Sequence, residues 1–215
     1  SDVYKRQHWG DPAFATDGYH ITPASAAMDA GVDAGMTADI DGETRPFGAG
    51  PDLGADEWVL GLIMIVSPTD GGTLIYTDTQ GSPTAIQVPA SAVTIETTLV
   101  YMSVETATAP SGLSFAGHAF DLDAYRGGAL LPGFTFSVPV TVAIHYSDAD
   151  IVGLDEDTLM LVYWTGSAWE DAACAPYDRH PNENWVAVPI CHLSRFALFG
   201  KEYTIYLPSV LRNHQ

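Results

Sequence analysis

The chain has 215 residues, and its 27 acidic and 8 basic side chains give a formal net charge of −19. Apolar residues make up 47 % of the chain, enough for a packed core, which argues against global disorder. A chain with this negative charge repels phosphate backbones and anionic lipids. We therefore expect neither nucleic-acid nor membrane-surface binding.

The N-terminus carries a segment that we exclude from the fold. Residues 1–7 (SDVYKRQ) resemble translated read-through of a sequencing adapter, so we expect the natural N-terminus and any export signal to be missing. The longest apolar run, residues 58–66, falls far short of the roughly 20 residues that a membrane-crossing helix needs. We therefore expect no membrane span.

Residues 8–58 read as an acidic, loop-like block rich in Gly, Asp and Ala. They offer few apolar runs that could form a core on their own. The one helix candidate is weak and covers residues 24–30, with Gly31 at its end.

Residues 59–200 differ, because short alternating apolar runs recur there with Gly, Pro, Asn and Asp between them. This spacing predicts an antiparallel β-sandwich and therefore an all-β fold. The expected strands cover residues 74–77, 85–88, 98–104, 114–122, 135–146, 158–164, 185–190 and 194–199. Thr165-Gly166 predicts a tight hairpin.

The clearest strand is residues 136–146, where every second residue is apolar. Six side chains should share its buried face: Phe136, Val138, Val140, Val142, Ile144 and Tyr146. Pro139 interrupts this strand, which predicts an edge position or a bulge.

Four segments of the first block carry a family pattern: residues 19–21 (YHI), 25–31 (SAAMDAG), 39–46 (DIDGETRP) and 52–58 (DLGADEW). They resemble the C-terminal end of bacterial secreted right-handed parallel β-helix proteins of the choice-of-anchor Q type. The chain departs at residues 26–28, where Pro-Ala-Ile is usual. The resemblance implies that residues 8–58 are the remnant of the last coil or two of a solenoid, with any solenoid active site upstream.

Four landmarks of the second block resemble a ZU5-like β-sandwich: residues 71–74 (GGTL), 88–93 (VPASAV), 139–142 (PVTV) and the aromatics from 163 to 169. Such domains mostly serve as interaction or spacer modules. Residues 201–215 look like the YLPLVLRN ending of some secreted bacterial proteins. This tail is a candidate sorting or anchoring signal, and its strand could also pair with a neighbour and build an assembly.

Cys174 and Cys191 are the only cysteines and lie 17 positions apart, each at the end of an expected strand. In an exported protein we expect them to form a disulfide, with two reduced core thiols as the alternative. A zinc site is disfavoured, because the chain offers only unusual ligand spacing around these cysteines.

Residues 191–198 (CHLSRFAL) are similar to the self-cleavage motif of GAIN domains and to the HFS site of some ZU5 domains. The resemblance implies that Ser194 attacks the Leu193 carbonyl while His192 takes the proton. The motif normally places one residue between its Cys and His, and here the two adjoin. The alternative is an ordinary final strand that packs Leu193, Phe196 and Leu198.

Asp39, Asp41 and Glu43 alternate around Gly42 and provide the oxygen ligands that calcium prefers. The loop lacks the distal Glu of an EF-hand, and Asp and Gly also simply favour turns. Otherwise we expect no cofactor. The sequence contains neither G-x-S-x-G nor H-E-x-x-H, and it has no Gly-rich phosphate loop.

These observations favour a non-enzymatic extracellular or cell-surface module that acts as a spacer, interaction or attachment unit, with an unknown surface protein or polysaccharide as partner. One alternative is self-cleavage between Leu193 and Ser194. The other is an accessory domain of a polysaccharide-acting β-helix enzyme, for which five aromatics are candidates for a sugar-stacking face: Tyr163, Trp164, Trp169, Tyr177 and Trp185. Packing of these aromatics in the core is the simpler reading.

Overall fold

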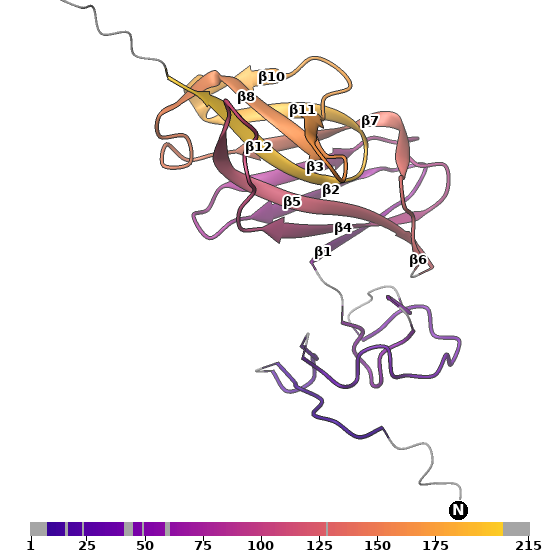
Figure 1. Cartoon of the computed structure of the whole chain (residues 1–215). Helices are drawn as coiled ribbons and strands as arrows, with labels where there is room; N and C mark the ends of the chain where they lie inside the picture. The colour runs from indigo at the N-terminus through magenta and orange to yellow at the C-terminus, as the bar shows by residue number, and fades with distance from the viewer. Residues whose placement is uncertain are drawn as a thin grey trace, which may run out of the picture.

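The computed structural model describes residues 8–15, 17–22, 24–40, 45–48, 50–58, 61–127 and 129–203. In this part of the chain the regular structure is twelve strands and one short 3-10 turn, Pro181–Glu183. The all-β prediction is confirmed, and the strands form two antiparallel sheets (Figure 1). Residues 1–7 and 204–215 lie outside the described residues, as do the predictions made for them.

The first sheet has the order β1-β4-β5-β12-β8-β9, and β6 pairs with β5. Its strands are β1 (Leu62–Val66), β4 (Thr97–Val104), β5 (Ser114–Arg126), β6 (Ala129–Leu130), β8 (Leu154–Trp164), β9 (Trp169–Asp171) and β12 (Arg195–Glu202). The second sheet has the order β10-β11-β7-β3-β2. Its strands are β2 (Gly72–Thr77), β3 (Pro83–Val88), β7 (Thr135–His145), β10 (Asp178–His180) and β11 (Trp185–His192).

All eight expected strands are present, with boundaries that differ by a few residues. The predicted hairpin at Thr165-Gly166 joins β8 to β9, where the Thr165 amide donates to Ala168 O at 2.9 Å. β9 is the second strand of this predicted hairpin, whereas three further strands, β1, β6 and β10, were not expected. β1 has a continuous apolar sequence with no alternation, and β6 and β10 have only two and three residues.

The prediction for Pro139 is half right. β7 is a central strand, flanked by β11 and β3, so the edge position is wrong. The bulge is confirmed, because the register between β11 and β7 shifts from Ile190↔Val140 to His192↔Thr135. The shift turns Val138 outward to 37 % exposure, whereas the other five apolar side chains of the alternating pattern are buried.

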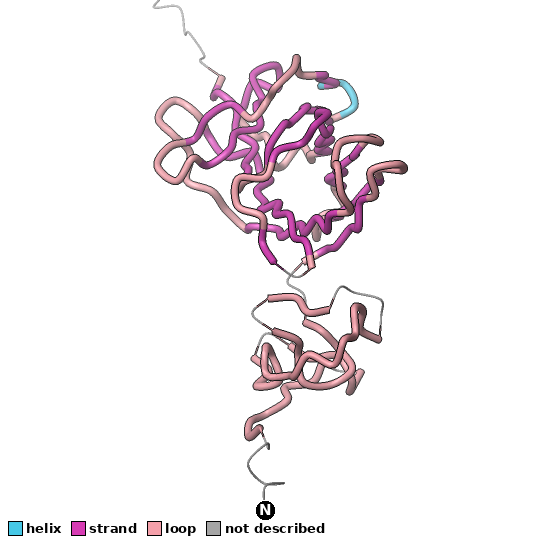
Figure 2. Tube along the Cα trace, turned by 90° about the vertical axis from the view of Figure 1, so that its right-hand side faces the viewer, coloured by secondary structure: helices cyan, strands magenta, loops and turns pink. Residues whose placement is uncertain are grey.

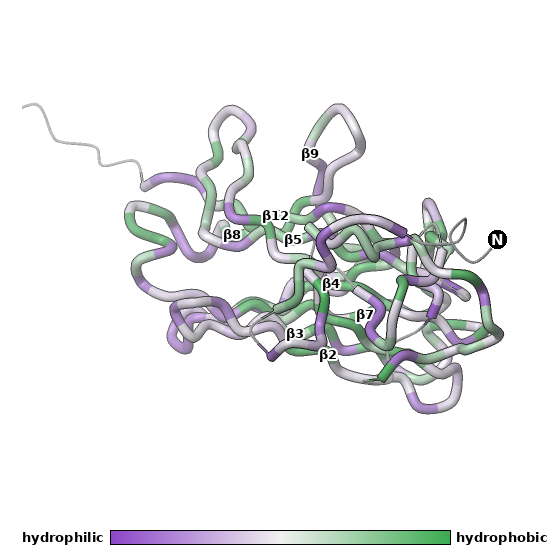
Figure 3. Tube along the Cα trace, turned by 90° about the horizontal axis from the view of Figure 1, so that it is seen from below, coloured by the Kyte–Doolittle hydropathy of each residue, from purple (hydrophilic) through white to green (hydrophobic). Residues whose placement is uncertain are grey.

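The core lies between the two sheets and takes alternate side chains from each. Phe120 and Phe196 are fully buried in the first sheet, as are Val142 and Val188 in the second. A row of rings runs through this layer: Tyr76 stacks on Tyr101 at 5.0 Å, Tyr101 on Phe120 at 4.9 Å, and Phe120 packs on Phe196 at 5.4 Å. Hydrophobic stretches lie along the strands in Figure 3.

A smaller apolar cluster covers the outer face of the first sheet. Ala119, Val162, Ala197 and Phe199 form its buried centre. The segment 104–113 folds over them, and Trp169 anchors it by donating from Nε1 to Thr108 O at 3.0 Å. The first sheet is therefore covered on both faces over this region.

The described part of residues 8–58 contains no regular strand or helix, and loops trace its whole course in Figure 2. The expected helix at residues 24–30 is wrong, since this segment forms turns. Asp29 has a φ of 52°, and the Ala27 carbonyl accepts from the distant Leu53 amide at 2.8 Å as well as from the Ala30 amide of its own turn at 3.2 Å. Phe47 contacts the sandwich, with its ring centroid 4.5 Å from that of Tyr125 on β5.

We expect Phe120→Ala to lower the free energy of unfolding of the sandwich by about 3–5 kcal/mol, because it removes a fully buried ring from the middle of the aromatic row. Val152→Ala is the control, since Val152 is 79 % exposed and its truncation should change stability by less than about 0.5 kcal/mol. Urea unfolding measures both values. Equal losses in the two variants would contradict the described core.

Candidate functional site

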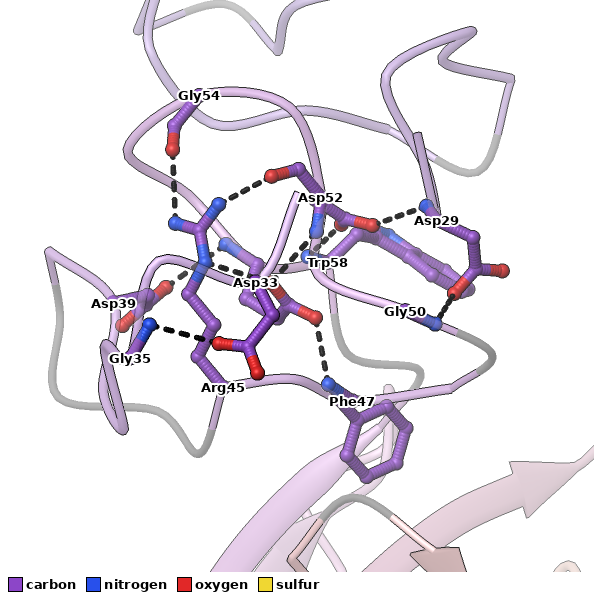
Figure 4. Close-up of polar contacts among 11 residues, drawn as sticks. Asp29, Asp33, Gly35, Asp39, Arg45, Phe47, Gly50, Asp52, Gly54 and Trp58 are labelled. Atoms are coloured by element: carbon purple, nitrogen blue, oxygen red, sulfur yellow. Dashed lines mark hydrogen bonds and ion pairs between the residues drawn. The ribbon is translucent and has the colours of Figure 1, made fainter. Parts of the chain in front are cut away.

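The charged residues of the N-terminal block meet around Arg45 (Figure 4). Its guanidinium donates to the Gly54 carbonyl at 2.8 Å and to the Asp52 carbonyl. Its Nε lies 3.3 Å from the carboxylate of Glu57, which is completely buried. A buried carboxylate needs such a partner, because an unpaired charge away from water is costly.

Three buried carboxylates bind backbone amides, and one of them, Asp56, accepts from the Ile21 amide at 2.6 Å. Asp52 accepts from the amides of Asp29 and Trp58, both at 2.6 Å. Glu57 accepts from the amide of Phe47 at 2.6 Å and from that of Asp52 at 2.9 Å. These contacts join residues that lie up to 35 positions apart in the sequence. The carboxylates replace the backbone pairing that strands would supply.

The network connects the four segments on which the family resemblance rests, and Ile21 of residues 19–21 joins it through the Asp56 carboxylate. Asp29 belongs to residues 25–31, Arg45 belongs to 39–46, and Asp52 and Glu57 belong to 52–58. Their side chains hold loop backbone in place, so their oxygens are engaged in structure. The acidic side chains of this block resemble those of a ligand site in composition, but here they stabilise the backbone of the loops.

Burial raises the pKa of both Asp52 and Glu57 above the ordinary carboxyl value. Their bonds from backbone amides oppose this shift, and Arg45 opposes it more weakly. Desolvation dominates for both groups. Ionisation of these carboxyls therefore costs more in the folded block than in water.

The structure places one of the three calcium candidates in this network. Asp39 accepts from the Glu57 amide at 3.1 Å, while Asp41 and Glu43 lie outside the described residues. Among the residues that are described, no group of three or more His, Cys, Asp or Glu side chains could hold a metal ion. The calcium hypothesis gains no support from this part of the chain.

A cavity of about 450 Å³ lies beside Arg45, within the N-terminal block. Several large apolar side chains on its walls are exposed to solvent: Val32, Met36, Ile40 and Leu53. These side chains give the walls of the cavity an exposed apolar surface.

The predicted disulfide is confirmed. Cys174 and Cys191 are bonded, with Cα atoms 6.0 Å apart. Flanking contacts bring the segment after β9 against β11, where Cys174 donates its amide to Pro189 O at 2.9 Å and Ala173 forms a bridge with Ile190. The bond therefore ties β11 to the chain that leaves the first sheet.

The 191–198 segment crosses from one sheet to the other, because β11 ends at His192 and β12 begins at Arg195. Ser194 donates its hydroxyl to the Trp164 carbonyl at 2.9 Å. His192 Nδ1 is buried without a hydrogen-bond partner, and the ring packs edge-on against Tyr163 at 4.3 Å. Neither Leu193 nor Ser194 has a positive φ. The nucleophile Ser194 and the base His192 that the motif implies are thus two positions apart in the sequence, but the hydroxyl is bonded to Trp164 O.

The five aromatics proposed for sugar stacking do not form one face. Trp164 and Trp169 pair on the first sheet, with ring centroids 5.2 Å apart. Trp185 instead stacks on His180 at 3.7 Å, beside the second sheet. Tyr163 and Tyr177 pack against the core between the sheets.

Sequence reasoning missed one residue that the fold places in a cavity. His118 lies on β5 with only 6 % of its side chain exposed, and its Nε2 has no hydrogen-bond partner. The sequence signal was a lone His within an apolar strand. Its cavity neighbours come from three distant segments, so spacing alone could not identify the site.

A comparison with protein-family models gives no match, and a comparison with curated proteins also gives none. In the described residues no helix has the length and apolarity to cross a membrane.

We expect replacement of both cysteines by Ser to lower the free energy of unfolding of the sandwich by about 2–4 kcal/mol, because the bond restricts the unfolded chain across 17 positions. Guanidinium unfolding with and without reductant measures the change. Reductant should lower the stability of the parent chain to that of the variant and leave the variant unchanged. A variant as stable as the oxidised parent would contradict this role.

We expect the stability of the N-terminal block to fall as the pH rises above about 4, where the carboxyls of an unfolded chain titrate. The raised pKa values of Asp52 and Glu57 mean that the folded block holds these protons more tightly than the unfolded chain, whose carboxyls titrate near about 4. Asp17 acts in the opposite sense, but only at lower pH, because its hydrogen bond with His20 lowers its pKa to about 2.

Hydrogen exchange of the Phe47 and Trp58 amides, corrected for intrinsic rates, measures this effect. Both amides donate to the two carboxylates, so their protection should decrease towards pH 7.5. The Val142 amide on β7 serves as the control and should keep its protection. Constant or increasing protection at Phe47 and Trp58 would contradict the assigned shifts.

Proposed function

We propose that the chain is a non-enzymatic extracellular module, a spacer or attachment unit of a secreted or cell-surface bacterial protein. In this proposal residues 8–58 are the end of a parallel β-helix and residues 59–200 are a ZU5-like sandwich. The first block ends the solenoid. The sandwich then holds the solenoid at a distance from the cell surface or binds a partner.

The observation that carries the proposal is that several reactive side chains make structural contacts within the fold. Ser194 donates to a main-chain carbonyl, and the two cysteines are bonded to each other. Asp52 and Glu57 accept from backbone amides. These five side chains are engaged in holding the fold.

Two further features support an extracellular location and a terminal position on a solenoid. A structural disulfide is typical of proteins that fold in an oxidising compartment. The exposed apolar side chains beside the 450 Å³ cavity fit a block whose preceding coil covers them.

The two alternatives, self-cleavage and polysaccharide binding, can each be distinguished from this proposal by a measurement on the purified chain. We expect the chain to keep a single full-length mass through a week at 37 °C between pH 5 and 8, because the Ser194 hydroxyl is bonded to Trp164 O. Intact mass spectrometry checks this, with Ser194→Ala as the matched control. Fragments 1–193 and 194–215 in the parent chain alone would overturn the proposal in favour of self-cleavage.

The same sample tests the polysaccharide alternative, for which the Trp164–Trp169 pair is the specific support. These rings line a cavity of about 340 Å³ together with Arg195. We expect no retardation in gels that contain acidic or neutral polysaccharides. Retardation that Trp164→Ala removes would replace the spacer function with that of a sugar-binding accessory domain.

A further inference from the structure

A second cavity, of about 430 Å³, lies where the turn after β2 approaches β4, β5 and the segment after β7. Its volume falls within the range of small-molecule sites, roughly 300–1,000 Å³. Its polar lining consists mainly of hydrogen-bond acceptors, among them Asp78, Gln80, Glu105, His118 and Asp150. No Lys or Arg is among the described residues that line it.

His118 provides an observation independent of this acidic lining. Its Nε2 is buried and has no hydrogen-bond partner, and the nearest charged oxygen, on Asp150, is 3.7 Å away. That distance is too long for a direct hydrogen bond. Buried polar atoms are satisfied in almost all native proteins, so an orphaned ring nitrogen in a cavity wall points to a missing partner.

The backbone is shaped to bring these two groups together. β5 is irregular at this point, because its register with β12 shifts between Ala119↔Ala197 and Phe115↔Phe199. Within the shift Gly117 has a φ of 79°, and a Cβ there would lie 2.5 Å from the Asp150 carboxylate. Only glycine leaves room for Asp150 beside the strand.

Asp150 is held in place by its own loop. One carboxylate oxygen accepts from the Ser147 amide at 2.7 Å and from the Ser147 hydroxyl at 2.6 Å. The same oxygen faces His118. The position of the carboxylate is therefore set before any ligand arrives, which lowers the entropic cost of binding.

The electrostatics favour a cationic donor. Burial lowers the pKa of His118 in spite of Asp150 and Asp78, so the imidazole is neutral at pH 7. The lining then carries the negative charges of Asp78, Glu105 and Asp150 with no compensating cation. With the ring proton on Nδ1, His118 Nε2 is an acceptor 3.7 Å from the acceptor oxygen of Asp150. One donor nitrogen with two or more N–H groups can then lie about 2.9 Å from both atoms.

We propose that this cavity binds an organic cation with a primary ammonium or guanidinium group, which donates to His118 Nε2 and Asp150 and is neutralised by the surrounding carboxylates. Tyr76 lines the cavity and offers an aromatic ring to such a group. A metal ion fits less well, since no described group of three His, Cys, Asp or Glu could hold one. This activity is separate from the spacer function and can fail without affecting it.

Titration calorimetry of the whole chain at pH 7.5 tests the proposal, with putrescine and argininamide as free cations and a blocked Gly-Lys-Gly peptide as a chain-borne one. We expect saturable 1:1 binding of at least one probe, and the free and peptide arms identify the source of the cation. Asp150→Asn keeps the acceptor for Ser147 but removes the charge, and it should weaken binding about tenfold or more.

Asp148→Asn is the matched control, because it changes the net charge equally within the same loop while Asp148 does not line the cavity. It should alter affinity by less than about twofold. Shifts of the His118 ring signals in the NMR spectrum of the parent chain give a readout that needs no variant. Absence of saturable binding, equal weakening in both variants, unmoved His118 signals or a preference for calcium would each overturn the proposal.

Discussion

Burial of apolar side chains between the two sheets is the interaction on which the rest of the sandwich depends. Consecutive strands β11 and β12 belong to opposite sheets, so the chain must cross the core edge at Leu193 and Ser194. The Leu193 amide donates to Phe134 O, and the Ser194 carbonyl accepts from the Leu122 amide. The segment that resembles a cleavage motif is thus a bend between sheets, and its polar atoms are used to make that bend.

The N-terminal block depends on a different kind of interaction. Among its described residues only Ile21 and Ala27 are buried apolar side chains, too few to form a core. Arg45 and the carboxylates of Asp52 and Glu57 supply the order instead, through bonds to backbone groups. Such a block is sensitive to charge and pH, whereas the sandwich is sensitive to loss of apolar volume.

The sequence allowed the fold class and most strands to be predicted, because side chains that alternate with period two leave a direct record of burial. It did not reveal β1, whose apolar run lacks alternation, and it suggested a helix at residues 24–30 where tertiary hydrogen bonds impose turns. The disulfide was predictable from two cysteines at strand ends. The cavity around His118 was not, because Asp78, Glu105 and Asp150 approach it only through the packing of separate loops.

Apolar burial stabilises the sandwich, whereas hydrogen bonds from backbone amides to buried carboxylates stabilise the N-terminal block. Differential scanning calorimetry tests this difference most directly. We expect two transitions, of which only the higher one, assigned to the sandwich with its Cys174–Cys191 bond, moves to lower temperature when reductant is added. A single transition, or a reductant effect confined to the lower one, would contradict the account.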